Sequence, residues 1–184
     1  MSNLENYMKQ QAIFCEQNDS ISKNLYSEYG VKRGLRDEKG QGVLTGLTNI
    51  SDIKAFEYHD GVKSPCDGEL SYRGYNIKDL VTGSKGKRFV FEEGAYLLLF
   101  GELPTDTQLM EFQGRLSDCM ELPTNFPRVV NMKAPTSDIM GSMTRSILTL
   151  GSYDKEKESL EIPNVLRQSM QLIAVFPMLA VYAY

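Results

Sequence analysis

The sequence predicts a mainly α-helical protein with a small β-rich segment near its amino terminus. More than half of the fifteen glycines lie between residues 30 and 74, where short β-prone pieces alternate with turns. From residue 89 onward, apolar residues recur at the spacing of amphipathic helices. Thr105 followed by Gln108 matches the capping box that begins many helices.

Composition places the chain among ordinary globular proteins and excludes several functions. It has 184 residues, of which 41% are hydrophobic and 24% charged, so a core of useful size can be buried. The net charge of −4 disfavours nucleic-acid binding, which needs a basic surface to neutralise phosphates. The three cysteines are odd in number and widely spaced, which favours reduced thiols over disulfides or a zinc site. The amino terminus does not resemble a signal peptide. We therefore expect a cytoplasmic protein with no metal.

The amino-terminal part is predicted to hold one helix and then a series of turns and small strands. Residues 4–15 have apolar residues at helical spacing, and residues 1–29 are predicted to form a helical extension before a domain that spans 30–184. We expect the His59-Asp60-Gly61 segment to form a turn. The predicted small strands cover residues 43–44, 50–53, 56–58 and 70–72.

Four helices are predicted after residue 89. They cover residues 91–100, a segment that begins after Thr105, residues 135–151 and residues 164–184, with a linker between Pro123 and Pro127. Gly141, Ser142 and Ser146 are small, which would let a partner helix approach residues 135–151 closely.

The last helix is predicted to be buried in protein rather than in a bilayer. The uncharged stretch 168–184 is shorter than the ~20 apolar residues that a membrane span needs. The chain stops at Tyr184 inside an apolar helical run, with no glycine cap or polar tail after it. We expect a chain cut in mid-domain; the alternative is a buried helix that simply ends there.

No self-contained active site is predicted from the residues. The loop that starts at Gly40 fails the dinucleotide-binding pattern because Thr45 stands where a glycine is required. His59 beside Asp60 could shuttle a proton, but a surface turn is the favoured interpretation. Arg33 and Arg36 could hold an anionic ligand, although a solvated basic turn is favoured.

Several stretches nevertheless resemble the amino-terminal part of the citrate synthase family. They are R-G-L from Arg33, G-V-L-T-G-L-T-N-I-S-D, G-E-L-S-Y-R-G-Y-N-I-K-D-L at 68–80 and F-E-E-G-A-Y-L-L-L-F-G-E-L-P-T at 91–105. The resemblance covers roughly residues 30–184 and is strongest to bacterial forms with a helical extension. It implies part of the family's helical large domain, truncated before the catalytic region. One departure is Ala134-Pro135-Thr136, where the family usually has His-Pro-Met.

The resemblance implies an acyltransferase that condenses acetyl-CoA with oxaloacetate and hydrolyses citryl-CoA to citrate and CoA in the tricarboxylic acid cycle. Acetyl-CoA is a substrate there, and no separate cofactor is expected. The family's catalytic residues, two histidines and an aspartate, match no motif in this chain, so we expect the chain alone to be inactive. Arg33 matches a family arginine near the CoA phosphates, which a guanidinium suits through forked hydrogen bonds.

The resemblance also implies a homodimer formed through helices 136–151 and 164–184, with no nucleic-acid or membrane partner. Two alternatives stay open. The chain could be a non-catalytic truncated product or dimerisation module, or it could be a fragment of a 2-methylcitrate synthase, which acts on propionyl-CoA.

Overall fold

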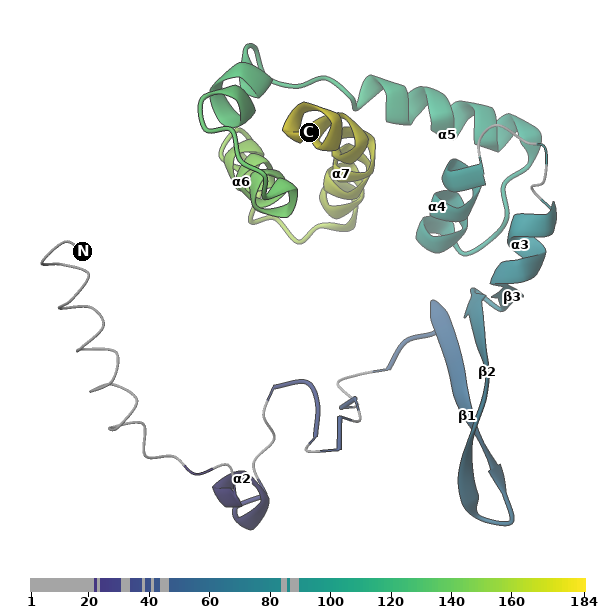
Figure 1. The fold of residues 1–184 in the computed structure, drawn as a ribbon. Helices are drawn as coiled ribbons and strands as arrows, with labels where there is room; N and C mark the ends of the chain where they lie inside the picture. Colours follow the sequence, from purple (N-terminus) through teal and green to yellow (C-terminus); the bar gives the residue numbers. More distant parts are fainter. Residues whose placement is uncertain are drawn as a thin grey trace, which may run out of the picture. The chain divides into compact units, whose positions relative to one another are not determined.

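The computed structural model describes residues 22, 24–30, 34–37, 39–40, 42–43, 47–83, 86 and 90–184. The chain divides into two compact units, residues Met1–Thr48 and Asn49–Tyr184. Within the first unit, the described residues form helix α2 (Asn24–Glu28) and one isolated β-bridge between Arg36 and Gly42 (Figure 1). The helix predicted at 4–15 lies outside the described residues.

The second unit begins with a β-hairpin that is longer than the predicted pieces. Strand β1 (Ser51–His59) pairs antiparallel with β2 (Val62–Tyr72), and β2 pairs with the short β3 (Tyr75–Asn76). The pieces predicted at 50–53 and 56–58 thus belong mostly to one strand, with a shift of register between Lys54 and Phe56. A register shift lets a strand continue through a local irregularity, which short apolar runs in the sequence do not reveal.

Two-residue turns join the three strands. Asp60 and Gly61 have φ of 50° and 80°, and Arg73 and Gly74 have φ of 49° and 85°. Positive φ at both central residues is the signature of the type I′ turn, whose twist matches that of the flanking strands. The turn predicted at His59-Asp60-Gly61 is therefore confirmed, with His59 as the last residue of β1.

Helices make up the rest of the unit, and the four predicted helices are confirmed with corrected ends. The elements are α3 (Ile77–Gly83), α4 (Val90–Phe100), α5 (Asp106–Asp118), the π-helix η1 (Arg128–Met132), α6 (Ile139–Gly151) and α7 (Ile162–Ala183). The capping box of α5 is present, since Thr105 Oγ1 accepts from Gln108 N at 3.3 Å and Gln108 Oε1 accepts from Thr105 N at 2.9 Å. α6 begins later than predicted because the Asp138 carboxylate caps it, accepting from Gly141 N at 2.9 Å.

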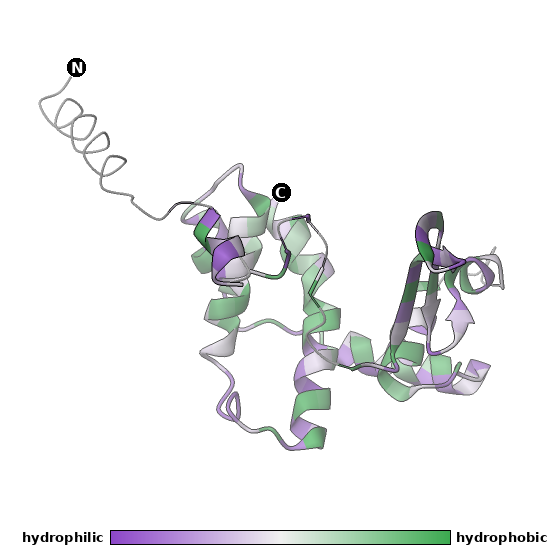
Figure 2. Ribbon diagram, turned by 90° about the horizontal axis from the view of Figure 1, so that it is seen from below, coloured by the Kyte–Doolittle hydropathy of each residue, from purple (hydrophilic) through white to green (hydrophobic). Residues whose placement is uncertain are grey.

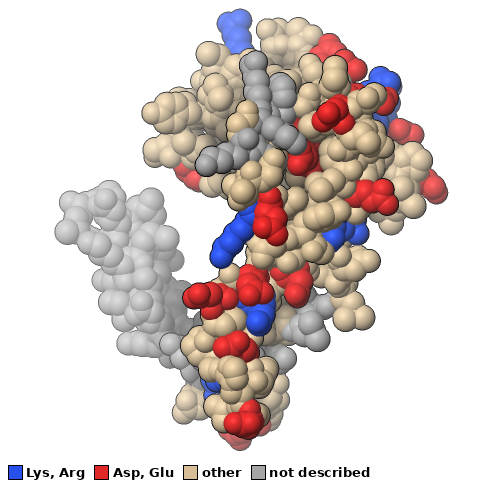
Figure 3. Space-filling view, turned by 90° about the vertical axis from the view of Figure 1, so that its right-hand side faces the viewer, with Lys and Arg blue, Asp and Glu red and all other residues tan. Residues whose placement is uncertain are grey.

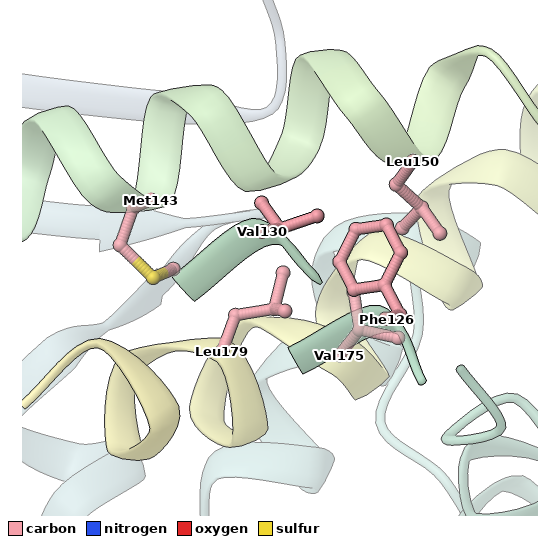
Figure 4. Close-up of a cluster of buried hydrophobic side chains, with 6 residues drawn as sticks. All are labelled: Phe126, Val130, Met143, Leu150, Val175 and Leu179. Atoms are coloured by element: carbon pink, nitrogen blue, oxygen red, sulfur yellow. The ribbon is translucent and has the colours of Figure 1, made fainter. Parts of the chain in front are cut away.

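Two clusters of buried side chains hold the helices together, and α7 contributes to both. The first brings side chains of α6 and α7 together with Val130 of η1 and with Phe126, two residues before η1 (Figure 4). It consists of Phe126, Val130, Met143, Leu150, Val175 and Leu179. The second cluster joins Phe112 and Leu116 of α5 to Ala174 of α7. Figure 2 shows hydrophobic residues interspersed with hydrophilic ones along the helices. The mainly helical fold with a small β segment is as predicted.

α7 is long and apolar enough to cross a membrane, judged by length and composition only. The uncharged stretch 168–184 did not indicate this, because the helix extends back to Ile162. A single such helix is weak evidence for a membrane span, since core helices of soluble proteins pass the same test. Here Ala174, Val175 and Leu179 pack one face of α7 against other helices of the chain.

Candidate functional site

The residues singled out for chemistry are not brought together. Arg33 lies outside the described residues. Arg36 donates from Nη1 to the carbonyl of Gly40 at 2.8 Å, which ties its guanidinium to a local turn. His59 lies at the end of the hairpin with its side chain 70% exposed, and its Nε2 is 3.0 Å from Glu57 Oε1. This placement matches the surface interpretation of His59. No cluster of three or more His, Cys, Asp or Glu side chains that could hold a metal occurs among the described residues.

The Y-R-G-Y stretch, one carrier of the family resemblance, has a structural role. Arg73 and Gly74 form the turn between β2 and β3, and Arg73 N donates to Ile50 O at 2.8 Å. Its guanidinium Nη2 donates to the carbonyl of Leu98 in the last turn of α4, at 3.0 Å. A cation suits this position, since the carbonyls at a helix carboxyl end lack partners and carry partial negative charge. Arg73 therefore links the small sheet to α4.

The segment that replaces the family's His-Pro-Met is also held by an arginine. Residues 134–137 are exposed, and Arg145 of α6 donates from Nη2 to Ala134 O at 2.9 Å. This segment follows η1, whose Asn131 is buried at 5% exposure. A short π-helix has no periodic signature in sequence. The sequence therefore predicted only a linker between Pro123 and Pro127 and not the π-helix that follows it.

The small side chains of Ser142 and Ser146 on α6 are covered by η1 of the same chain. Ser142 and Ser146 are 3% and 0% exposed, and both face η1 of the same chain. Asn131 Nδ2 donates to Ser142 Oγ at 3.3 Å, and Ser146 Oγ lies 3.5 Å from Asn131 Oδ1. The close approach predicted for this side is correct in geometry, but its partner is intramolecular. Any further helix must pack elsewhere on α6.

Large apolar side chains are exposed on other faces of α6 and α7. On α6, Met140 and Leu148 are 74% and 72% exposed, two turns apart on one side of the helix. On α7, Leu172 and Phe176 are exposed one turn apart. An open groove of about 590 Å³ runs along Leu172 and Phe176 and is lined almost wholly by apolar atoms. We call it the α7 groove. Its lining residues are Phe91, Met143, Leu172, Ile173, Phe176, Pro177 and Ala180.

Charged side chains show no comparable cluster on the face that Figure 3 displays. On the face shown in Figure 3, acidic and basic side chains are scattered over the helical part rather than gathered into one patch. Among the described residues, the one carboxyl with a clearly displaced pKa is Asp154, in the loop between α6 and α7. Hydrogen bonds from Gln168, Arg167 and the Glu156 backbone, in that order, lower its pKa from 3.8 to about 2. Asp154 already accepts from all three groups, so it is not placed to serve as a base or as a ligand.

The described residues thus offer an apolar helical face rather than a catalytic constellation, and exposed apolar patches mark association surfaces. Comparison with known proteins agrees with the resemblance found in the sequence. A family model described as "Citrate synthase, C-terminal domain" matches residues 35–184. The 2-methylcitrate synthase of Shewanella oneidensis is 33% identical over 115 residues, covering 62% of this chain and 28% of that protein. The citrate synthase of Saccharolobus solfataricus is 30% identical over 154 residues, covering 84% and 35% respectively.

Solved structures give the same family. The citrate synthase of Pyrobaculum aerophilum matches with a TM-score of 0.63 and 26% identity, over 80% of this chain and 35% of that one. The citrate synthase of Thermoplasma acidophilum, solved as a ternary complex with carboxymethyl coenzyme A and oxaloacetate, matches with a TM-score of 0.63 over 77% and 33%. Its 18% identity supports the fold alone. The chain spans about a third of the length of the curated relatives it matches.

Proposed function

Because this chain belongs to the citrate synthase family, we propose that it forms part of an enzyme that condenses acetyl-CoA with oxaloacetate and hydrolyses citryl-CoA to citrate and CoA. The observation that carries the proposal is the family match over residues 35–184. The reaction would supply citrate to the tricarboxylic acid cycle. A 2-methylcitrate synthase that uses propionyl-CoA is the second candidate, because the curated relatives include both activities.

The role proposed for these residues is scaffolding rather than chemistry. The reaction develops negative charge on an enolate oxygen, which needs preorganised donors in a cleft that excludes water. The family pattern assigns this work to two histidines and an aspartate. This chain has a single histidine, His59, which lies at the exposed end of the hairpin. The buried clusters around Leu179 and Phe112 instead build the helical layer from which such a site could be held.

A chimaera tests whether these residues serve as a scaffold for catalytic residues elsewhere in the enzyme. Residues 35–184 would replace the matching segment of the Saccharolobus solfataricus citrate synthase, and release of the CoA thiol would be followed with acetyl-CoA or propionyl-CoA. We expect the chimaera to show activity with oxaloacetate, and the purified 184-residue chain to show none above background. Activity of the 184-residue chain alone would overturn the scaffolding role. A folded but inactive chimaera would argue against the family function for these residues.

Arg33 is proposed to contact the phosphates of CoA. The support is its match to the family arginine and the suitability of a guanidinium for forked hydrogen bonds to phosphate. In a chimaera extended to residues 30–184 of this chain, Arg33→Gln should raise the KM for acetyl-CoA and leave kcat nearly unchanged, because it removes binding that the ground and transition states share. Arg36→Gln is the matched control, since the Arg36 guanidinium is engaged by Gly40. Equal KM values for the two variants would refute the assignment.

We also propose that the protein is a cytoplasmic homodimer formed through α6 and α7. The exposed side chains of Met140, Leu148, Leu172 and Phe176 support this, and so does the absence of charged residues from 168 to 184, since pairing that part of α7 would desolvate no charged side chain. A two-fold axis would bring the same apolar faces together. The odd number of widely spaced cysteines supports the location.

Sedimentation velocity on charged variants tests the interface. We expect the wild-type chain to sediment as a dimer and Phe176→Glu to weaken association by at least about tenfold, because a buried unpaired carboxylate is costly. Leu160→Glu is the control, since Leu160 is 87% exposed in the loop before α7. A wild-type monomer at all concentrations, or equal dimerisation of Phe176→Glu, would remove the proposal. Far-UV circular dichroism confirms that each variant is folded.

A further inference from the structure

The two halves of α7 are held by different kinds of contact. Its buried apolar residues, Ala174, Val175 and Leu179, all lie in the carboxyl-terminal half. In the amino-terminal half the one buried residue is Asn164, which is polar. Val165 and Ile162, the apolar residues nearest to it, are 41% and 82% exposed. Fully buried apolar side chains therefore anchor only the second half of the helix, while Met170, near the end of the first half, is partly buried against the second cluster.

Asn164 ties the start of α7 to the loop that precedes it. Its Nδ2 donates to the carbonyls of Glu156 and Ser159, at 2.8 and 3.0 Å. Its Oδ1 accepts from Arg167 Nε at 3.1 Å. The amide therefore uses both its donors and its acceptor within residues 156–167, and none of these bonds reaches the apolar core.

Asp154 completes this polar network from the other end of the loop. Arg167 Nη2 lies 2.8 Å from both carboxylate oxygens, and Gln168 Nε2 donates to Oδ2 at 2.9 Å. Glu156 N donates to Oδ1 at 3.0 Å, which folds the loop back on itself. The Asp154 side chain is 16% exposed and the Arg167 side chain 43% exposed, so the ion pair lies at the surface and is partly open to water. One carboxylate thus joins the loop to two successive residues of α7.

We propose that residues 152–169 form a latch that opens and closes as one unit, held shut by the Asp154 carboxylate, while the carboxyl-terminal half of α7 stays docked. Proteins open locally where few apolar contacts resist opening, and cooperative units often coincide with such segments. Tyr153, Asp154 and Arg167 form one wall of an open cleft of about 370 Å³ whose other wall includes residues 121–124, so opening the latch would remove that first wall. The inference concerns the chain itself and does not depend on the proposed enzyme function.

Hydrogen–deuterium exchange with peptide resolution tests the latch on the full 184-residue chain. Asp154→Asn keeps the side-chain volume and the acceptor for Glu156 N, but removes the charge that binds Arg167. We expect exchange in residues 155–169 to become about tenfold faster or more, because charge-assisted hydrogen bonds are the strong ones. Exchange in residues 172–183 should change little. Glu158→Gln is the matched control, since Glu158 is an exposed carboxylate in the same loop.

Three outcomes would overturn the proposal. Equal acceleration in both halves of α7 would show that the helix opens as a whole. No acceleration in Asp154→Asn, or the same acceleration in Glu158→Gln, would show that Asp154 does not hold the segment. Arg167→Lys provides a second variant in case Asp154→Asn folds poorly. It retains the charge but not the Nε donor to Asn164, so we expect acceleration smaller than in Asp154→Asn and confined to the same residues.

Discussion

The β1–β2 hairpin and the helical layer obtain their order from different sources. Ile53 and Tyr58 of the hairpin are 72% and 68% exposed, whereas Leu97, Val175 and Leu179 of the helices are completely buried. The hairpin depends on the type I′ turn at Asp60–Gly61, on backbone pairing, and on the Arg73 turn that ends β2 and links it to α4. The helical layer depends on apolar burial. Substitutions in the two regions should therefore differ in size and in mechanism.

The largest effect is expected from Leu179→Ala in the core between α6 and α7. The side chain is 0% exposed and lies beside Val130 and Val175 (Figure 4). Truncation removes apolar contacts and leaves a cavity, so it should lower the free energy of unfolding by about 3 kcal/mol. Urea unfolding measures this as a lower midpoint at an unchanged slope.

Leu160→Ala is the matched control, with the same chemistry at 87% exposure in the loop before α7. It should change the free energy of unfolding by less than about 0.5 kcal/mol. If the two leucines cost the same, burial would not be what distinguishes the helical layer.

The next effect tests the link between the two regions. Arg73→Gln shortens the side chain and removes the charged donor to Leu98 O. A hydrogen bond from a charged group contributes about 1.5 kcal/mol, so the unfolding free energy should fall by roughly that amount. Amide exchange should rise in β3 and in the last turn of α4 together. Arg115→Gln is the control, because its ion pairs are 3.9 Å long and exposed, and such pairs contribute little.

The sequence predicted those structural features that are determined by residues close together in the chain. The Thr105–Gln108 capping box and the turn at Asp60–Gly61 depend only on side chains that are neighbours in sequence. The partner of Ser142 and Ser146 could not be found in this way, since Asn131 reaches them through a π-helix with no periodic pattern. Asp154 and Arg167 are likewise 13 residues apart. Their pairing depends on how α6 and α7 pack, which no local sequence pattern indicates.

A third prediction follows from the lowered pKa of Asp154. Its folded-state pKa is about 2, against 3.8 for a free side chain, so folding favours the ionised form. The stabilisation is complete above about pH 4 and is lost as the pH falls through about 2. Urea midpoints of wild type and Asp154→Asn should therefore converge on acidification. Because the pair lies at the surface, water screens it and the effect should be smaller than that of Arg73→Gln. A difference that is independent of pH would show that the carboxylate charge is not the cause.

The smallest effect is expected within the hairpin itself, where Lys63 Nζ lies 4.0 Å from the centroid of the Phe56 ring. An exposed cation–π contact contributes about 0.5 kcal/mol. A double-mutant cycle with Lys63→Gln and Phe56→Leu isolates that pair from the other effects of each change. The readout is the free energy of hairpin opening, taken from amide exchange of the β1–β2 pairs. A coupling near zero would mean that the turns and the backbone pairing hold the outer hairpin by themselves. A coupling well above 1 kcal/mol would mean that side-chain contacts order this region too, and would narrow the contrast with the helical layer.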